Sequence, residues 1–573
     1  MRHQRPGPEH SLSSEKGSWK KSWTGRLPVG LIFPNAYRVG MSNLGFQLVY
    51  DMLNCLDEVV CERLFLPADG EMALSVESSR PITDFPILLV SLSFEKDIIS
   101  LLSMLLAGNI EPLAEKRAGL PVKPVSPLII AGGVACSINP EPLAPFVDLM
   151  VIGEADPPLT QIMSRLIREG LPGDRSSVLA EFGRKIVGCY VPAFYEYFYT
   201  AHRKLEKIVA RQGLPARIAV SRSENKEVAV CSKIVTPAAE FSDLFLVELG
   251  RGCSRGCRFC AAGYVYRPPR LRSLASVLEA LHERPEGITK VGLLGMEMAK
   301  AEDLAQIVDT LLAQGCRLSF SSLRADTLND SLIRLLADSN LKTVALAPDG
   351  GSERLRKVIN KGITREDILG SAEKLVRAGV VNLKLYFMIG LPTETEEDLL
   401  EMVTLVREVL GVMSGPGRER GRLSTLTLSI NPFVPKAWTP FQFHPFATIE
   451  QLKNKMKFLR QNLVGVANLK IMGEKPDSAF LQAVIARGDR RLAPALIELA
   501  KSGANWRHVF RQNDITTDDY VGCDRGEGEI FPWTIIDHRI KPGYLWREYQ
   551  RALGEKMTAP CDTSRCKKCG CCS

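Results

Sequence analysis

The sequence predicts an α/β protein in which two sets of alternating strands and helices precede a small, mainly helical region rich in cysteine. Short apolar strands alternate with helical stretches from residue 27 to about 170, and the same alternation returns from 244 to 445. We expect the first set to form a doubly wound parallel sheet and the second a partial (β/α)6 barrel. The last thirteen residues, CDTSRCKKCGCCS, hold five cysteines.

The composition indicates a globular protein of several domains. A hydrophobic content of 45% in 573 residues supports full cores. No apolar run approaches the ~20 residues of a membrane span, and the first 25 residues lack the apolar centre of a signal peptide. Neither membrane insertion nor secretion is expected. The 15 cysteines then predict a cytoplasmic protein whose thiols serve metals rather than disulfides.

Residues 1–26 are rich in Ser, Lys, Arg, His and Pro, and we expect them to be disordered. Much of the net charge of +8 lies in this tail. Two interpretations are open, a solvated basic tail and an arm that binds RNA.

The doubly wound domain is expected over residues 27–170. A sheet of this kind binds ligands at the carboxyl ends of its strands. A connector of strands or hairpins follows over residues 171–243. The expected strands are VGLIF, ILLVSLS (87–93), PLIIAGG (127–133) and LMVIGEA (149–155), with helices over 42–54, 95–107 and 157–168.

The barrel is expected over residues 244–445, with its active site at the carboxyl ends of the strands. Thr364 with Asp367 and Thr395 with Asp398 have the spacing of capping boxes that open two of its helices. The first of six strands runs into the cysteine loop, and the other five are expected at 289–295, 317–322, 342–347, 381–389 and 424–430.

Three cysteines with C-x3-C-x2-C spacing, Cys253, Cys257 and Cys260, follow the first barrel strand. Three thiolates in one loop can hold three irons of a 4Fe-4S cluster, because iron prefers thiolate sulfur. The fourth iron can then bind S-adenosylmethionine (SAM) and pass on the electron that cleaves it to a 5′-deoxyadenosyl radical. The alternatives are three incidental thiols or a zinc site, but zinc normally needs a fourth ligand, and the nearest histidine is His282.

This segment closely resembles the radical SAM superfamily, which carries C-x3-C-x-aromatic-C directly after a strand. Phe259 is the aromatic residue of the pattern. The resemblance implies that Gly295, Met296 and Glu297 contact the amino group of SAM, with Met296 in place of the family's usual second glycine. It also implies that Arg324 pairs with the carboxylate, that Ser352 meets the ribose, and that Ile389 and Gly390 wall the adenine.

The N-terminal domain resembles cobalamin-binding domains, with one departure. The family's histidine, the lower ligand of cobalt, is replaced by Tyr37. Cobalamin could bind without a protein ligand to cobalt, or the domain could be a docking scaffold. The residues that carry the resemblance are Tyr37, Gly40, Ser91, Ser93, Gly132 and Gly133.

Cysteines elsewhere in the chain raise two further questions. Cys55, Cys61 and Cys136 match no compact metal site and are expected to be buried thiols, although methylthiotransferases of the superfamily hold a second cluster in this domain. In the C-terminal region, residues 446–573, the spacing C-x4-C-x2-C-x2-C predicts an auxiliary iron–sulfur cluster or a zinc site, with a flexible reactive tail as the third alternative. Its ligands would be Cys561, Cys566, Cys569 and Cys572, with Cys571 spare.

The leading hypothesis is an enzyme that cleaves SAM reductively and, if cobalamin is present, transfers a methyl group to an unreactive carbon. The alternatives are sulfur insertion into RNA or protein, and a non-catalytic iron–sulfur protein that binds RNA or a partner. A reductant protein of the flavodoxin or ferredoxin type and a small partner protein are expected. No sequence pattern identifies the substrate.

Overall fold

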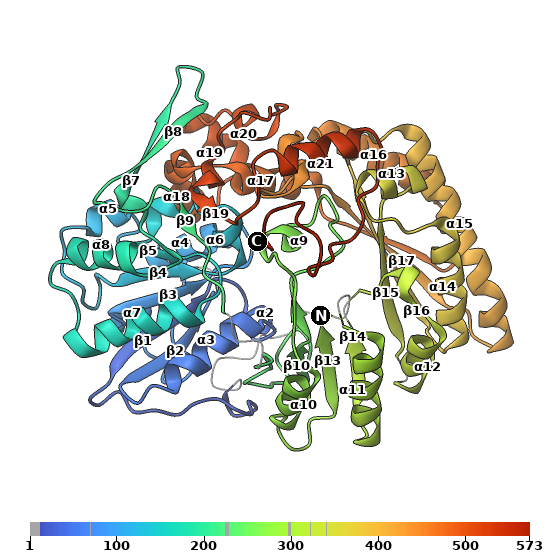
Figure 1. The fold of residues 1–573 in the computed structure, drawn as a ribbon, viewed down its shortest axis with the longest axis horizontal. Helices are drawn as coiled ribbons and strands as arrows, with labels where there is room; N and C mark the ends of the chain where they lie inside the picture. Colours follow the sequence, from blue (N-terminus) through green and yellow to red (C-terminus); the bar gives the residue numbers. More distant parts are fainter. Residues whose placement is uncertain are drawn as a thin grey trace.

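The computed structural model describes residues 12–68, 70–223, 228–295, 299–320, 322–339 and 341–572. It has an N-terminal sheet domain, a barrel beside it, and C-terminal helices that lie across the same end of both (Figure 1). No helix of the described residues is long and apolar enough to cross a membrane.

The N-terminal domain is a six-stranded sheet with helices on both faces. Its strand order is β2-β1-β3-β4-β5-β6, and all neighbours are parallel except β5 and β6. The first five strands have the order of flavodoxin-like doubly wound sheets. The strands are β1 (Leu27–Phe33), β2 (Val59–Phe65), β3 (Ile87–Ser91), β4 (Leu128–Gly132), β5 (Leu149–Val151) and β6 (Cys189–Tyr190), and the helices are α2 (Tyr37–Gly40), α3 (Leu44–Asn54), α4 (Asp97–Ala107), α5 (Ala114–Arg117), α6 (Val134–Ile138), α7 (Asp156–Glu169) and α8 (Arg175–Lys185).

Strand β2 is an edge strand that the sequence did not predict. It reads VVCERLF and all seven residues are buried, including Glu62 and Arg63. Adjacent charges normally indicate an exposed segment, but both have partners here. The Glu62 carboxylate accepts hydrogen bonds from Trp23 and Ser75, each at 2.6 Å, and Arg63 forms ion pairs at 2.7 and 2.6 Å with Glu15 and Glu77.

Residues 12–26 pack against this domain, which differs from the disorder expected for residues 1–26. The indole nitrogen of Trp19 donates to Asp51 at 2.9 Å, and the ring of Trp23 lies 5.0 Å from that of Phe85. Glu15 supplies a carboxylate to the buried guanidinium of Arg63. Residues 1–11 of the expected tail lie outside the described residues.

The connector contains a hairpin, as the sequence indicates. Strands β7 (Tyr195–Tyr199) and β8 (Leu205–Ala210) pair in antiparallel fashion and form an arm that extends from the body of the molecule (Figure 1). Further along, β9 (Ile218–Ala219) pairs with β19 (Ile536–Asp537) of the C-terminal region. The connector therefore joins the first domain to the last segment of the chain.

The barrel contains seven parallel strands among the described residues, one more than expected. Strands β10-β13-β14 form one sheet and β15-β16-β17-β18 a second, and a parallel bridge between Leu323 and Leu346 links them. The extra strand, β18, follows α16 and pairs with β17. The strands are β10 (Leu244–Glu248), β13 (Lys290–Leu294), β14 (Arg317–Phe320), β15 (Thr343–Asp349), β16 (Asn382–Ile389), β17 (Thr425–Pro432) and β18 (Leu469–Met472), with a short ribbon of β11 (Gly250–Arg251) and β12 (Arg270–Leu271).

Helices follow the barrel strands in the order that the sequence predicts. Both predicted capping boxes, Thr364 with Asp367 and Thr395 with Asp398, are confirmed at the starts of α14 and α15. The helices are α9 (Ala262–Val265), α10 (Leu274–His282), α11 (Ala301–Ala313), α12 (Asp330–Asp338), α13 (Glu353–Val358), α14 (Arg365–Arg377), α15 (Glu396–Glu419) and α16 (Ile449–Asn462).

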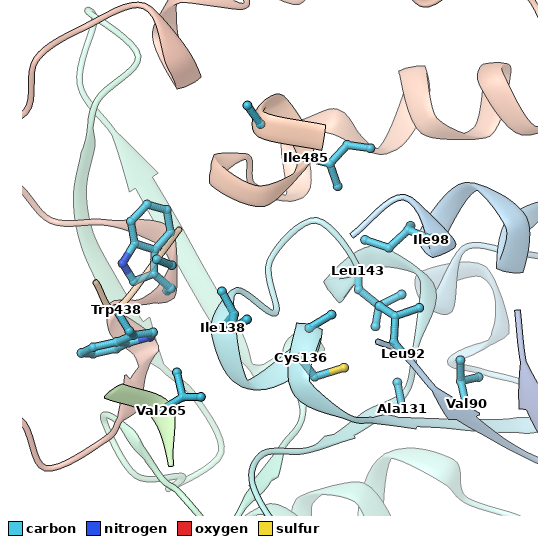
Figure 2. Packing of buried hydrophobic residues seen from close by; sticks show 14 of the residues in the cluster. Val90, Leu92, Ile98, Ala131, Cys136, Ile138, Leu143, Val265, Trp438 and Ile485 are labelled. Atoms are coloured by element: carbon cyan, nitrogen blue, oxygen red, sulfur yellow. The ribbon is translucent and has the colours of Figure 1, made fainter. Parts of the chain in front are cut away.

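The C-terminal region joins the other two parts. The side-chain amide of Asn139, in the N-terminal domain, donates to the carbonyls of Ala486 and Gly488 at 3.1 and 2.8 Å. Figure 2 shows Cys136 in an apolar junction to which Trp438 of the barrel also contributes, so this thiol is a buried packing group. Cys61 is buried as well, whereas the expectation for Cys55 is wrong, because it lies exposed at the end of α3. The helices of the region are α17 (Pro476–Arg487), α18 (Ala493–Ser502), α19 (Trp506–Gln512), α20 (Asp518–Val521) and α21 (Tyr544–Leu553).

The buried ion pair of Glu15 gives a test of the packed N-terminal segment. Because both side chains are fully buried, Glu15→Ala leaves Arg63 with one carboxylate instead of two. We expect it to lower the free energy of unfolding by about 2–3 kcal/mol in urea denaturation. Glu240→Ala removes the exposed partner of Arg38 and should cost less than about 1 kcal/mol. If Glu15→Ala and Glu240→Ala lower the free energy of unfolding by the same small amount, residues 12–26 add little to the stability of the protein.

Candidate active site

The loop that carries the three cysteines begins at the carboxyl end of β10, at the rim of the barrel. Gly252 has a φ of +93°, and a Cβ atom there would lie 2.8 Å from the carbonyl oxygen of Tyr266. Gly256 has a φ of +71°. Both turns therefore favour glycine, which can adopt a positive φ without strain.

Burial and nearby positive groups act in opposite directions on two of the three thiols of the loop. Burial raises the pKa of the Cys257 thiol to about 12, while the charges of Lys361 and Arg324 act in the opposite direction. Burial also raises the pKa of Cys260, whose sulfur is approached by the backbone N–H groups of Gly263 and Ala262. Cations and N–H groups directed at sulfur stabilise thiolates. If the three cysteines hold a 4Fe-4S cluster, as the sequence predicts, the cluster would supply the electron for SAM cleavage, and these cations and N–H groups would offset part of the cost of burying its thiolates.

A buried arginine inside the loop fixes it to the rest of the protein. Arg258, between Cys257 and Cys260, is fully buried. Its guanidinium donates to the carbonyls of Val358 and Lys556 at 2.8 and 2.6 Å, and it pairs with Glu548 at 3.3 Å. Val358 ends α13, Glu548 lies on α21, and Lys556 follows α21. One side chain thus joins the loop to the barrel and to the C-terminal region.

Asn360, which lies shortly after α13, also holds the cysteine loop in place. Its side-chain amide donates to the carbonyls of Arg255 and Gly256 at 3.3 and 3.2 Å, and its oxygen accepts from the backbone of Thr558 at 2.8 Å. The backbone N–H of Cys561 also donates to the carbonyl of Ser254, at 2.7 Å. The cysteine-rich tail therefore contacts the loop directly, which the sequence did not indicate.

The residues predicted to contact the amino group of SAM are only partly described. Gly295 follows β13 with a φ of +83°, and a Cβ there would lie 2.6 Å from the carbonyl of Gly250. Glycine is therefore required where β13 passes the start of the loop. Met296 and Glu297 lie outside the described residues.

Arg324 and Ser352 lie at the same rim and already have protein partners. Arg324 forms a two-pronged pair with Asp326, both distances being 2.9 Å, and donates to the carbonyl of Lys361 at 2.6 Å. The Ser352 hydroxyl donates to Asp398 and caps α13. Contact of either residue with SAM remains a prediction, and it requires these partners to be shared or exchanged.

The predicted adenine wall lies at the end of β16. Ile389 is fully buried, and the N–H of Gly390 donates to Glu394 at 2.7 Å. Gly390 has a φ of +80°, and a Cβ there would come within 3.0 Å of Leu452 and Ala447. Phe259 is partly buried against the main apolar core. These placements leave the predicted contacts untested.

Sequence reasoning missed one buried ion pair at this rim. The Lys361 ammonium pairs with Asp349 at 2.7 Å, and both side chains are largely buried. The charge of Lys361 is the largest that favours the thiolate of Cys257. The two residues are twelve positions apart, at a strand end and after a short helix, so no local pattern marks them as partners.

A cavity of about 440 Å³ lies at the carboxyl edge of the N-terminal sheet. Ser91, Ser93, Gly132 and Gly133, four of the residues that carry the cobalamin resemblance, line it. The barrel side of the cavity is formed by Arg251, which precedes the three cysteines, by Tyr266, which follows them, and by Leu294 at the end of β13. The cavity therefore lies between the N-terminal domain and the cysteine loop.

Tyr37 and Gly40 are not among the residues that line this cavity. The Tyr37 hydroxyl donates to Glu15, and its ring packs edge-on against Phe65 at 5.1 Å. Burial and the charge of Glu15 raise the pKa of this tyrosine. A Cβ on Gly40 would lie 2.5 Å from the Phe65 ring. None of the described lining residues is a histidine, so the cavity offers cobalt no histidine from this set.

The tail cysteines gather beside the loop. The Cys561 thiol interacts electrostatically with those of Cys566, Cys569 and Cys572. Cys571, expected to be spare, lies 3.6 Å from the carbonyl of His538 and also hydrogen-bonds to Cys569. The described residues contain no group of three or more His, Cys, Asp or Glu placed as ligands of a metal ion, and this applies to the tail and to the loop alike.

Comparison with known families decides the class of the protein. Residues 247–406 match the profile of the radical SAM superfamily, and residues 45–192 match that of the N-terminal part of radical SAM proteins. The chain belongs to the radical SAM superfamily. This radical SAM protein is therefore an enzyme, and the non-catalytic alternative is set aside.

Two relatives place this radical SAM enzyme among known proteins. It is 28% identical over 505 residues to an uncharacterized protein of Methanocaldococcus jannaschii, covering 87% of this chain and 97% of the relative. It is 26% identical to the tRNA-2-methylthio-N(6)-dimethylallyladenosine synthase of Chloroherpeton thalassium, over 39% of this chain and 54% of that protein. Among solved structures, it is similar to the apo form of the cobalamin-dependent radical SAM enzyme OxsB, with 13% identity, a TM-score of 0.44 and coverage of 86% and 72% of the two chains.

The anchoring of the loop by Arg258 can be tested through cluster content. We expect Arg258→Met to lower the iron and sulfide bound per folded chain several-fold after anaerobic reconstitution, because the loop loses its fixed orientation. Arg175→Met is a matched control, since Arg175 is also buried but lies in the N-terminal domain. Equal cluster content in both variants would contradict the anchoring role.

Proposed function

We propose that this radical SAM enzyme binds a cobalamin in the cavity between its N-terminal sheet and its cysteine loop, and methylates an unreactive carbon of its substrate. The observation that carries the proposal is the position of the cavity. Its lining combines Ser91, Ser93 and the Gly132-Gly133 turn with Arg251, two residues before Cys253. A cofactor held there would lie next to the cluster loop.

The lining of the cavity fits part of a cobalamin. Small residues and strand side chains such as Leu31, Leu89 and Ile130 leave a mostly apolar slot of about 440 Å³. That volume lies in the usual range for ligand pockets of about 300–1,000 Å³ and suits a nucleotide-sized group, such as the nucleotide tail of cobalamin. The corrin ring would extend toward the barrel. Tyr37 lies away from the cavity, which favours binding without a protein ligand to cobalt.

The chain's own residues would orient the two cofactor sites relative to each other. Glu154, at the cavity, accepts hydrogen bonds from Arg270 and pairs with Arg251 at 3.3 Å. Arg251 also forms a two-pronged pair with Glu248, at the end of β10. These contacts would fix the distance between the cavity and the cluster loop. Electrons would come from a flavodoxin or ferredoxin type of reductant, and a small partner protein would complete the system in the cytoplasm.

Filling the cavity tests the proposal. A Cβ on Gly45, which lines the cavity on α3, would approach only Asn43, at 3.4 Å, so Gly45→Phe can project into the space. We expect wild-type protein, purified anaerobically with added cobalamin, to show a cobalamin absorption band that Gly45→Phe loses. Formation of 5′-deoxyadenosine should remain in the variant.

Gly370→Phe is the matched control for this experiment. Gly370 is also a helix glycine with nothing within 4 Å of an added Cβ, but it lies on α14, away from the cavity. It should retain the cobalamin band. If wild-type protein shows no cobalamin band, the proposal that cobalamin binds in the cavity is wrong. Formation of 5′-deoxyadenosine would still support SAM cleavage in that case.

Sulfur insertion into RNA is the second candidate. The observation that favours it is the contact between the tail and the loop, where Cys561 N–H meets Ser254 O at 2.7 Å, beside the thiols of Cys566, Cys569 and Cys572. An auxiliary iron–sulfur cluster or zinc site there would lie beside the catalytic loop. Several relatives, 25–31% identical over 27–39% of the chain, are tRNA-2-methylthio-N(6)-dimethylallyladenosine synthases.

Metal analysis tests the tail site separately from the loop. A variant with serine at Cys253, Cys257 and Cys260 should still bind metal after anaerobic reconstitution. Adding Cys566→Ser should remove it, whereas adding Cys571→Ser or Cys55→Ser should not, because Cys571 is the expected spare thiol and Cys55 is an exposed thiol of the N-terminal domain. Iron with sulfide indicates an auxiliary cluster and zinc a structural site. Absence of metal from the triple variant would exclude both.

A further inference from the structure

A surface groove of about 680 Å³ lies beside helix α16 of the barrel. Its other side is the segment 473–476, which leads from β18 into α17. The groove residues of the α16 side recur at intervals of three and four positions, so they form one stripe about 16 Å long. These residues are Lys453, Met456, Lys457, Arg460 and Gln461, followed by Val464 just after the helix. We call this surface the α16 groove.

The lining of the α16 groove is strongly basic. Its cations, all exposed, are Lys453, Lys457, Arg460 and Lys475. Glu474 is the one acidic residue among the described lining residues, and its carboxylate is already engaged. It accepts hydrogen bonds from Lys96 of the N-terminal domain at 3.1 Å and from Ser478 at 2.7 Å. Glu474 is therefore directed away from the neutralisation of the groove's own cations.

Most of these cations have no counterion within the described chain. Lys453 lies 3.4 Å from Asp477, in an exposed pair. Lys457, Arg460 and Lys475 form no ion pair with any residue that the structure describes. Because their side chains are exposed, an incoming ligand can contact their charged ends directly. The groove thus attracts a negatively charged ligand.

The groove also presents apolar surface. Val464, at one end of the stripe, is 80% exposed, and Met472, directly before the segment 473–476, is 57% exposed. Met456 and Pro476 add apolar surface between the cations. Exposed apolar side chains with charged residues around them are typical of surfaces that bind other proteins.

The shape and lining of the groove favour a helix over a nucleic acid strand. None of the described lining residues is aromatic, whereas surfaces that bind single-stranded nucleic acids combine basic residues with aromatic rings on which the bases stack. A stripe of about three helical turns matches the length over which an amphipathic helix docks in a groove. The apolar face of such a helix would bury Val464.

We propose that the α16 groove is the docking site for an acidic amphipathic helix of a partner protein. The apolar face of that helix contacts Val464, and its Asp or Glu side chains lie opposite Lys457 and Arg460. Charge complementarity favours this occupant, because its carboxylates supply the counterions that the described chain does not. The proposal rests on the proposed function, which includes a small partner protein, and it names the surface and the chemistry of that contact.

A fluorescent peptide of about three helical turns, with leucine on one face and glutamate on either side of it, tests the groove on the full-length protein. We expect wild-type protein to bind it, with an affinity that falls as salt is added. Lys457→Glu should bind it at least about tenfold more weakly, and Val464→Ser several-fold more weakly. Both variants change exposed residues.

Two controls separate docking in the groove from general attraction between charges. Lys501→Glu reverses an exposed lysine of α18 outside the groove and should leave the affinity unchanged. A peptide with lysine in place of glutamate should not bind wild-type protein. The measurement needs neither an iron–sulfur cluster nor cobalamin, so its failure is distinct from loss of 5′-deoxyadenosine formation or of the cobalamin band.

Three results would overturn the proposal. The first is that wild-type protein does not bind the acidic peptide, or that Lys457→Glu binds it equally well. The second is that a single-stranded uridylate oligonucleotide binds in place of the peptide, with an affinity that Lys457→Glu lowers and Val464→Ser does not, which would make the groove a nucleic acid surface. The third is that wild-type protein sediments as a dimer that Lys457→Glu dissociates, which would make a second copy the occupant.

Discussion

The arrangement of the active site depends on the burial of one guanidinium group. Arg258 lies between two of the three cluster cysteines and is fully buried, a position in which an arginine must satisfy most of its donors within the protein. Its partners are backbone carbonyls and a carboxylate from α13, α21 and the segment after α21. Its own N–H donates to Ile359 at 3.0 Å. The loop therefore cannot shift without leaving a buried charge unpaired.

This constraint matters because the barrel has two separate cores. Strands β10, β13 and β14 with helices α10 and α11 bury one apolar cluster, whereas β15 to β17 share a larger cluster with the N-terminal and C-terminal regions. The cysteine loop starts from the smaller core. Arg258 and Asn360 hold it against the larger one, where Lys361 and Asp349 lie. The reactive rim is thus assembled across a junction, by these polar contacts together with Phe259, Tyr264 and Val265, which pack against the larger core.

Local patterns in the sequence predicted most elements and the class of the site. Capping boxes, apolar strands and the spacing of Cys253, Cys257 and Cys260 are local signals, and they appear at the expected places. The missed features depend on distant partners. Strand β2 was hidden because the partners of its charges are distant in the sequence: Trp23 donates a hydrogen bond to Glu62, and Glu15 pairs with Arg63. The sequence also could not show that Asp326 engages Arg324 or that the tail reaches the loop.

The junction between the cavity and the loop is also polar. Burial alone would raise the pKa of Glu154, but hydrogen bonds from Arg270 and the charge of Arg251 lower it overall. A carboxylate with a lowered pKa stabilises the folded state above its unfolded pKa and loses that contribution as pH falls through its folded value. At neutral pH the interactions of Glu154 with Arg251 and Arg270 therefore contribute fully to the stability of the folded state. The two-pronged pair of Arg251 with Glu248 also fixes the orientation of the arginine that contacts Glu154. The ion pairs of Glu154 with Arg251 and Arg270 therefore hold the edge of the N-terminal sheet against the start of the cysteine loop.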